Sequence, residues 1–336
     1  MWLKLLLTVF ITYISAFNIS DPSSFNHKYI QLPSGIYHYV DQGPCEAPLV
    51  VLLHGFPESW YTWKYQIDYL VNKLNYRAIS LDMAGYGTTV IKNDLEYYTF
   101  DRLSNDVIHI VKQLKKDKVV VIGHNWGSKL GWELAYKFPN YVKGFISFSS
   151  PYTPNLSTPK TELEKAIINP VYGYQVALNQ GNITEFNNNI DKVLKMFWAT
   201  NKSKLSDKRV QVPLNMSLLE YYDTLNKTDD IYPDEKFMHY LHSQYSIQGF
   251  NNSINWYRTS KLNDSNDLKK PNLNILVKSL QILGQNDFLS ATADTYIRFI
   301  RDITTKYVEN GGHWIHFVNS TVVNKYIHNF LYELKY

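Results

Sequence analysis

The sequence predicts an α/β protein with a mostly parallel sheet that is flanked by helices and carries an inserted helical cap. Apolar runs such as 48–54 and 119–122 alternate with segments whose apolar residues recur at helical spacing, which is typical of a doubly wound sheet. From about residue 151 to 271 the strand pattern fades, and several helix-like pieces rich in Asn, Asp and Lys follow one another. We therefore expect a core formed by residues 28–150 and 272–336, and a cap formed by residues 151–271.

The composition indicates a globular protein. Of the 336 residues, 45% are hydrophobic and 15% are aromatic, far more than a disordered chain contains. The net charge is only +4, and the lysines of 115–118 and 269–270 form short clusters rather than a basic stripe, so nucleic-acid binding is not expected. The histidines and acidic residues show no metal-ligand spacing, so neither a metal nor an organic cofactor is expected.

The individual elements follow from the pattern in chain order. Segments 28–32 and 35–40 alternate between apolar and polar residues around a Pro-Ser-Gly turn, which predicts a hairpin. The run 48–54 is apolar almost throughout, as a strand buried on both faces requires. Core strands are also expected at 76–82, 119–122, 141–149, 276–283 and 306–309, and core helices at 58–74, 100–114, 291–303 and 321–334. Cap helices are expected at 162–168, 171–178, 188–198, 234–248 and 250–257.

The stretch 119–131, VVVIGHNWGSKLG, predicts a sharp turn from a strand into a helix. Gly123 and Gly127 stand two residues before and two residues after Asn125, which is the spacing of a nucleophile elbow that holds its central side chain above a sheet. Elbows usually carry Ser, Cys or Asp at the centre. The neutral amide of Asn125 is a poor attacking group, so the geometry predicts a hydrolase while the chemistry of this one side chain does not.

A catalytic acid and base can be sought by their order in the chain, since α/β-hydrolases place the nucleophile first, then the acid, then the histidine. Asp287 follows a late strand, and His313 lies in a glycine turn before the last helix. Their joint placement favours a catalytic pair over two ordinary turn residues. The oxyanion hole is expected from the backbone N–H of Trp126 and that of Phe56.

Seven motifs resemble the epoxide hydrolases of the α/β-hydrolase superfamily, from roughly residue 28 to the end of the chain. They are HGFPESWYTWKYQI at 54–67, LDMAGYG at 81–87, GHNWG at 123–127, NPVYGYQ at 169–175, NWYR at 255–258, GQNDF at 284–288 and GGHW at 311–314. The resemblance implies an α/β-hydrolase fold and a small apolar epoxide as substrate. Its two cap motifs distinguish it from the haloalkane dehalogenases, which do not use a tyrosine pair.

The resemblance also implies roles for individual residues. In that family the position of Asn125 holds an aspartate that attacks the epoxide carbon, and His313, oriented by Asp287, activates water to hydrolyse the resulting ester. Tyr174 and Tyr257 would donate hydrogen bonds to the epoxide oxygen, which must gain a proton as the ring opens. The chain has 27 tyrosines, so the motif context rather than the residue type selects these two, and Tyr172 is a nearby fallback.

Asn125 leaves three hypotheses open. In the first, the protein is a pseudoenzyme that binds an epoxide, a lipid or another small apolar ligand in the same pocket. In the second, water activated by His313 attacks the side-chain carbonyl of Asn125 and converts it to aspartate; deamidation through the backbone is disfavoured because bulky Trp126 follows. In the third, water attacks an ester or epoxide directly and Asn125 only holds the substrate.

A serine hydrolase is a weaker alternative. Ser128 lies three residues beyond the centre of the elbow, inside the expected helix, and could not act as nucleophile without a backbone movement. Ser149 and Ser150 stand at the end of a strand and are expected to be turn residues.

Residues 1–17 predict a cleaved secretory signal peptide. Lys4 precedes an apolar run that ends in small residues and is shorter than the roughly 20 residues of a membrane span. We therefore expect a protein that is secreted or resides in the ER lumen; the alternative is an uncleaved N-terminal anchor, the only membrane association expected. Glycosylation sequons agree with export; they begin at Asn18, Asn155, Asn182, Asn201, Asn215, Asn226, Asn251, Asn263 and Asn319. The single cysteine, Cys45, permits no internal disulfide and does not decide the compartment.

Overall fold

The computed structural model describes residues 17–199, 210–228 and 230–334, so the expected signal peptide lies outside the described residues. A mixed sheet runs through the core in the order β1-β2-β4-β3-β6-β7-β8-β9, with β5 paired to β2. The pairs that β2 makes are antiparallel, and the pairs from β4 to β9 are parallel. The strands are β1 His27–Leu32, β2 Gly35–Gln42, β3 Leu49–Leu53, β4 Arg77–Leu81, β5 Val90–Ile91, β6 Val119–His124, β7 Val142–Phe148, β8 Ser279–Gly284 and β9 Ile303–Val308.

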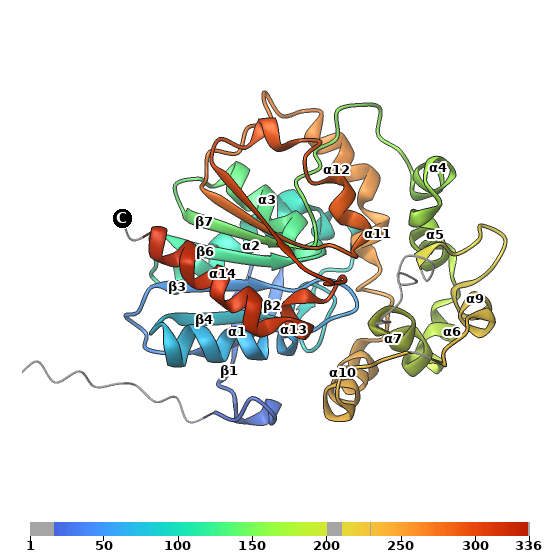
Figure 1. The fold of residues 1–336 in the computed structure, drawn as a ribbon, viewed down its shortest axis with the longest axis horizontal. Helices are drawn as coiled ribbons and strands as arrows, with labels where there is room; N and C mark the ends of the chain where they lie inside the picture. Colours follow the sequence, from blue (N-terminus) through green and yellow to red (C-terminus); the bar gives the residue numbers. More distant parts are fainter. Residues whose placement is uncertain (1–16, 200–209, 229, 335–336) are drawn as a thin grey trace, which may run out of the picture.

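Helices cover both faces of this sheet (Figure 1). One face carries α1 and α14, which contact each other, and the other face carries α2 and α3. The core helices are α1 Lys64–Asp68, α2 Phe100–Gln113, α3 Trp126–Lys137, α13 Ile315–Val318 and α14 Ser320–Glu333. Strands β3 and β6 are buried at every position, which explains why their sequences are apolar without alternation. The predicted α/β-hydrolase architecture is confirmed.

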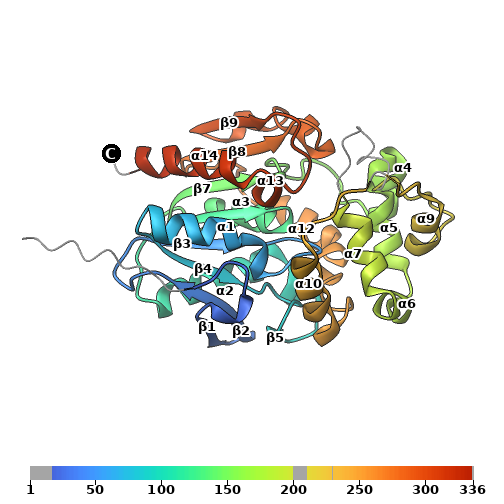
Figure 2. The ribbon, with the colours of Figure 1, turned by 60° about the horizontal axis from the view of Figure 1, so that its bottom comes forward.

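The described chain between β7 and β8 folds into a helical insertion at one end of the sheet (Figure 2). These are α4 Glu162–Ile168, α5 Gly173–Gln180, α6 Ile183–Asn188, α7 Ile190–Trp198, α9 Leu218–Thr224, α10 Glu235–Gln248, α11 Asn255–Arg258 and α12 Ser260–Asp267, with the 3-10 turn η5 Pro170–Tyr172 before α5. Two indole N–H groups of this insertion donate hydrogen bonds to carbonyls of the core. Trp198 donates to the carbonyl of Pro57 at 2.8 Å, and Trp256 donates to that of Ala84 at 2.8 Å. The predicted helical insertion is therefore present.

Several predicted elements differ from the structure. The helix expected at 291–303 is wrong: the chain there makes only the 3-10 turns η6 Phe288–Thr292 and η7 Ile297–Phe299, because it buries too few apolar side chains to form a helical face. The helix expected at 58–74 is divided into the 3-10 turn η2 Trp60–Trp63, α1 and the π-helical η3 Tyr69–Lys73. A 3-10 turn aligns residues three apart, which brings Trp60 and Trp63 into the core together, both fully buried.

Within the described part of the insertion, the helices α6, α9 and α12 were not predicted. Two of them have N-terminal signals that the sequence could have provided. The Asn182 side chain caps α6 by accepting from two backbone N–H groups, and Ser217 with Glu220 forms a capping box on α9. Of the helix expected at 250–257, only residues 255–257 are helical, as part of α11. Among the residues that the structure describes, no helix combines the length and apolar character that a membrane crossing requires.

Candidate active site

The turn between β6 and α3 holds Asn125 in an unusual backbone conformation, with φ 52° and ψ −118°. This is a strained conformation for a residue with a side chain. The flanking glycines make the turn possible: a Cβ on Gly123 would lie 2.4 Å from the carbonyl oxygen of Gly127, and a Cβ on Gly127 would lie 2.0 Å from that of Leu53. The sequence spacing is therefore a packing requirement, and the predicted sharp turn is present.

The fold brings Asn125, His313 and Asp287 into one hydrogen-bonded chain. Nδ2 of Asn125 lies 3.0 Å from Nε2 of His313, and Nδ1 of His313 lies 2.9 Å from Oδ2 of Asp287. Because the Asp287 carboxylate only accepts, His313 donates from Nδ1 and accepts the Asn125 amide at Nε2. Burial by itself would lower the pKa of His313, but the carboxylate of Asp287 outweighs it and raises this pKa above its ordinary value.

The side-chain oxygen of Asn125 faces a backbone donor. The N–H of Phe56, in the loop after β3, donates to Oδ1 of Asn125 at 3.3 Å. Trp126 is the first residue of α3, so its N–H belongs to the group of helix N-terminal donors that lack an intrahelical acceptor. Strand β6 is a parallel neighbour of β3 and is separated from β8 by β7 alone, which explains why the residues that follow the carboxyl ends of these strands converge here.

The two cap tyrosines lie together beside this site. The rings of Tyr174, on α5, and Tyr257, on α11, are 6.0 Å apart and nearly perpendicular. The Tyr257 ring also contacts the ring of Phe56 at 5.4 Å and that of Trp126 at 4.9 Å. Both tyrosines are buried, whereas Tyr172 lies in η5 and is half-buried. The structure therefore brings all seven predicted site residues to one place, with Tyr172 two residues away along the chain.

Comparisons with known proteins identify the superfamily of this chain. The model of the alpha/beta hydrolase fold family matches residues 48–320. The chain belongs to the α/β-hydrolase superfamily. It is similar to the bifunctional epoxide hydrolase 2 of Sus scrofa, with 29% identity over 309 residues that cover 88% of this chain and 53% of that protein. It is also similar to epoxide hydrolase 4 of Homo sapiens, with 29% identity over 327 residues that cover 94% of this chain and 81% of that protein.

A solved epoxide hydrolase from an endophytic Streptomyces has the same fold, with a TM-score of 0.81, 24% identity, and coverage of 93% of this chain and 96% of that one. The chain spans about half the length of the mammalian bifunctional relatives that it matches, 53% in the Sus scrofa protein. Within this superfamily, the chain is similar to proteins named as epoxide hydrolases.

In this α/β-hydrolase two of the three candidate serines, Ser128 and Ser149, donate hydrogen bonds to backbone carbonyls. Ser128 is fully buried, and its hydroxyl lies 2.6 Å from the carbonyl oxygen of Gly123 and 3.0 Å from that of Phe148. The hydroxyl of Ser149 donates to the main-chain carbonyl oxygen of His313 at 2.8 Å. Because both hydroxyls donate to backbone carbonyls rather than to a general base, neither Ser128 nor Ser149 is placed to act as a nucleophile.

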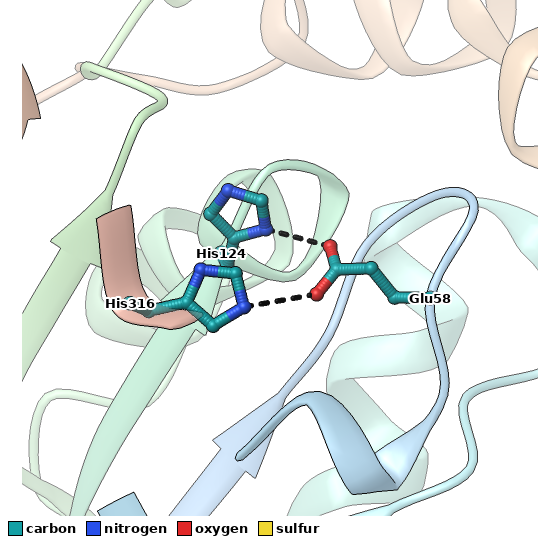
Figure 3. Close-up of side chains that lie close together, drawn as sticks. All are labelled: Glu58, His124 and His316. Atoms are coloured by element: carbon teal, nitrogen blue, oxygen red, sulfur yellow. Dashed lines mark hydrogen bonds and ion pairs between the residues drawn. The ribbon is translucent and has the colours of Figure 1, made fainter. Parts of the chain in front are cut away.

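A second ionisable cluster lies beneath the α/β-hydrolase site and was missed by the sequence analysis. Glu58, from the loop after β3, lies between His124 at the end of β6 and His316 on α13 (Figure 3). Oε1 of Glu58 lies 2.6 Å from Nδ1 of His124 and accepts from the N–H of Gly55 at 2.8 Å, while Oε2 lies 3.3 Å from Nε2 of His316. All three ionisable side chains are fully buried. His124 continues the network, since its Nε2 donates to the carbonyl oxygen of His313 at 2.9 Å.

The geometry of this cluster fits a shared proton better than a metal ion. Ligand atoms around a tetrahedral zinc ion are about 3.4 Å apart for bonds of about 2.0–2.1 Å, so the 2.6 Å between Glu58 and His124 leaves no room for an ion. Burial raises the pKa of Glu58, but the neighbouring His124 and His316 outweigh it and hold that pKa well below its usual range. Burial and the neighbouring His124 lower the pKa of His316 to about 3, so His316 is neutral.

Proposed function

We propose that this protein adds water to a small apolar epoxide and gives a diol. The observation that carries the proposal is the hydrogen-bonded chain from residue 125 through His313 to Asp287, beside the paired rings of Tyr174 and Tyr257. A hydrolase that lost its chemistry would have no need of a histidine held by a buried carboxylate at the elbow. The relatives named as epoxide hydrolases support the substrate class.

In the proposed reaction the side chain of residue 125 attacks one carbon of the epoxide ring, which requires that Asn125 has first been hydrolysed to aspartate. Tyr174 and Tyr257 donate hydrogen bonds to the epoxide oxygen as its negative charge develops, which lowers the barrier to ring opening. The product of this step is an ester between residue 125 and the opened substrate. Water that has lost a proton to Nε2 of His313 then attacks the ester carbonyl, and the N–H groups of Phe56 and Trp126 stabilise the oxyanion. The diol leaves and the carboxylate is restored.

The amide of Asn125 favours a second candidate, a pseudoenzyme that binds a small apolar ligand at the same site. A neutral amide cannot open the ring efficiently, and loss of a nucleophile leaves only the contribution of binding and the oxyanion hole. A third possibility is direct attack of water on an ester or epoxide while Asn125 holds the substrate. If water attacks directly, the Asn125→Ala variant keeps most of the turnover. A complete loss of turnover in Asn125→Ala excludes direct attack.

One experiment separates these functions. Diol formation from styrene oxide is measured for the wild type, Asn125→Asp and His313→Ala, with folding checked by circular dichroism. Turnover by Asn125→Asp with none by His313→Ala supports the proposed chemistry. If only the Asp variant turns over, and the wild type forms no diol even after long incubation, the natural protein is a binding pseudoenzyme. If folded Asn125→Asp gives no diol from styrene oxide or from an aliphatic epoxide, the proposed function is wrong.

We also propose that the protein enters the secretory pathway through a cleaved leader at residues 1–17 and is secreted or retained in the ER lumen, with residues 151–271 acting as the lid over the core. Of the described sequon asparagines, Asn263 is buried, whereas five are exposed, as a glycan requires, namely Asn18, Asn182, Asn215, Asn226 and Asn251. The N-terminal sequence of protein recovered from the medium of a secreting host tests the leader. A product that stays membrane-bound and retains Met1 supports the anchor instead.

A further inference from the structure

We propose that the site hydrolyses the side-chain amide of its own Asn125 and converts this residue to aspartate, with release of ammonia. The inference rests on the proposed function, because it supplies the carboxylate that the proposed function needs. It makes Asn125 a modification site, and the chemistry that modifies it is the second half of the proposed reaction applied to an amide instead of an ester.

The first step of the argument is the position of the leaving group. Nδ2 of Asn125 lies 3.0 Å from Nε2 of His313, so the nitrogen that must leave as ammonia already contacts the group that can protonate it. The other ring nitrogen of His313 is held by Asp287 at 2.9 Å, which fixes the ring orientation and stabilises the imidazolium that forms during the reaction. An amide turned the other way would point its oxygen at His313 and its nitrogen at a backbone donor.

The second step is the polarisation of the carbonyl. Oδ1 of Asn125 accepts the N–H of Phe56 at 3.3 Å, and Asn125 directly precedes the first turn of α3, a helix of 12 residues whose N-terminus carries a partial positive charge. Both features stabilise the negative charge that forms on Oδ1 when a nucleophile adds to Cγ. The amide oxygen and nitrogen are therefore oriented as the carbonyl oxygen and leaving group of an acyl transfer.

The third step is the rigidity of the side chain. A Cβ built on Gly55 would lie 2.5 Å from both Cβ and Oδ1 of Asn125, so the amide is packed directly against the backbone of the loop after β3. Together with the strained turn at Asn125, this contact holds the amide in one orientation. The reacting groups are thus held close together before any ligand binds, which removes most of the entropic cost of bringing them together.

The bonds and protons of the step balance. Nε2 of His313 takes a proton from water as the water oxygen bonds to Cγ of Asn125, and the negative charge moves to Oδ1. The imidazolium then gives its proton to Nδ2, the bond between Cγ and Nδ2 breaks, and ammonia leaves. Cγ is left as a carboxylic acid, which loses its proton to give the aspartate at position 125. One water is consumed and one ammonia is released in each chain.

A slow reaction is sufficient, because it happens once in each molecule. An amide is less electrophilic than an ester and ammonia is a poorer leaving group than an alcohol, so we expect the conversion to be much slower than ester hydrolysis at the same site. A freshly made protein would be inactive and would gain activity with age.

The experiment follows the mass of the peptide that contains residue 125 during incubation of the purified full chain, together with released ammonia. The chain offers an internal reference, since Asn310 precedes Gly311 and such pairs deamidate spontaneously through a backbone imide that yields isoaspartate as well as aspartate. We expect Asn125 to become aspartate only, with no isoaspartate. In His313→Ala and Asp287→Asn the conversion at position 125 is lost, while Asn310 reacts as in the wild type.

The wild type by itself decides the outcome even where a variant fails to fold. A peptide that remains entirely asparagine after long incubation overturns the inference, as does isoaspartate at position 125 or an unchanged conversion rate in folded His313→Ala. The two proposals fail separately. If Asn125→Asp forms diol but the wild type never converts, self-conversion is wrong and the epoxide chemistry stands. If the wild type converts but neither form turns over an epoxide, the assigned function is wrong and the self-conversion stands.

Discussion

The hydroxyl of Ser149 donates a 2.8 Å hydrogen bond to the main-chain carbonyl oxygen of His313. Ser149 follows β7 with a positive φ of 55°, so it occupies a strained conformation in order to reach the turn that carries the candidate base. His124 donates to the same carbonyl at 2.9 Å. Two side chains from neighbouring strands therefore fix the backbone of a residue that follows the last strand.

Removal of the Ser149 hydroxyl is expected to slow catalysis without removing a catalytic group. Ser149→Gly accepts the positive φ and deletes only the hydrogen bond, so in the Asn125→Asp background we expect kcat for diol formation to fall about 10-fold through misplacement of His313. The Ser243→Gly variant, which removes an exposed hydroxyl from the insertion, is the control for glycine substitution. An unchanged kcat in folded Ser149→Gly would contradict the positioning role.

The tyrosine pair is expected to act in ring opening. In the Asn125→Asp background, Tyr174→Phe and Tyr257→Phe should each lower the rate of ester formation about 10²-fold, because each removes one donor to the developing oxyanion. Single-turnover kinetics that separate ester formation from its hydrolysis measure this effect. Tyr172→Phe is the matched control and should leave the rate unchanged. A larger loss in Tyr172→Phe than in Tyr174→Phe would move the role to Tyr172.

In the Asn125→Asp variant, the loss of activity on the acid side of the pH profile is expected at a higher pH than an ordinary histidine would give. His313 must be neutral to accept a proton, and Asp287 and, more weakly, Glu58 raise its pKa against the effect of burial. The rate of ester hydrolysis should therefore fall as the pH drops through a value above the ordinary 6.5 of histidine. The rate of ester hydrolysis as a function of pH measures this.

The Asp287→Asn variant tests whether Asp287 is the group that raises the pKa of His313. In this variant the loss of activity on the acid side should move to lower pH, and the rate of ester hydrolysis should fall about 10²-fold or more. A loss of activity that stays at the same pH would show that a group other than Asp287 raises the pKa of His313.

The buried His316 is expected to make the fold sensitive to acid. Its pKa is about 3 in the folded protein and 6.5 ordinarily, so between these values the unfolded chain binds more protons than the folded one. The stability due to neutral His316 is complete above 6.5 and declines as the pH falls toward 3. In His316→Gln, which cannot take up this proton, Tm should drop less between about pH 7 and about pH 5 than in the wild type.

Thermal unfolding at several pH values measures the effect of His316→Gln, and His239→Gln, at an exposed histidine, is the control. Equal acid sensitivity in wild type and His316→Gln would mean that another group of the cluster carries the linkage.

The sequon at Asn263 is expected to remain unmodified in secreted protein. Asn263 is buried, and its Oδ1 accepts from the backbone N–H of Phe100 at 2.9 Å, so a glycan would displace α12 from α2. Exposed Asn215 has no such constraint. Glycopeptide mapping of protein secreted by a eukaryotic host compares the two sites. A glycan at Asn263 in folded, soluble product would require a different packing of the lid on the core.

The sequence alone determined the fold class and the order of the site residues. The runs at 48–54 and 119–122 are apolar because β3 and β6 are buried on both faces, and the glycines around Asn125 are required by contacts closer than any side chain allows. Such features are local, so they leave a readable pattern. The 3-10 turns that replace the helix expected at 291–303 left no such pattern, since few of their side chains are buried.

Tertiary structure alone decided which distant groups meet. Glu58, His124 and His316 come from three segments that are far apart in the chain, and nothing in their spacing reveals that their ligand atoms lie within 4.8 Å of one another. The sequence also did not reveal that the Asn125 amide points toward His313, or that the Ser149 hydroxyl donates to the main-chain carbonyl of His313. Periodicity and turn residues encode local burial and backbone geometry, whereas these contacts exist only once parallel strands align their carboxyl ends at one edge of the sheet.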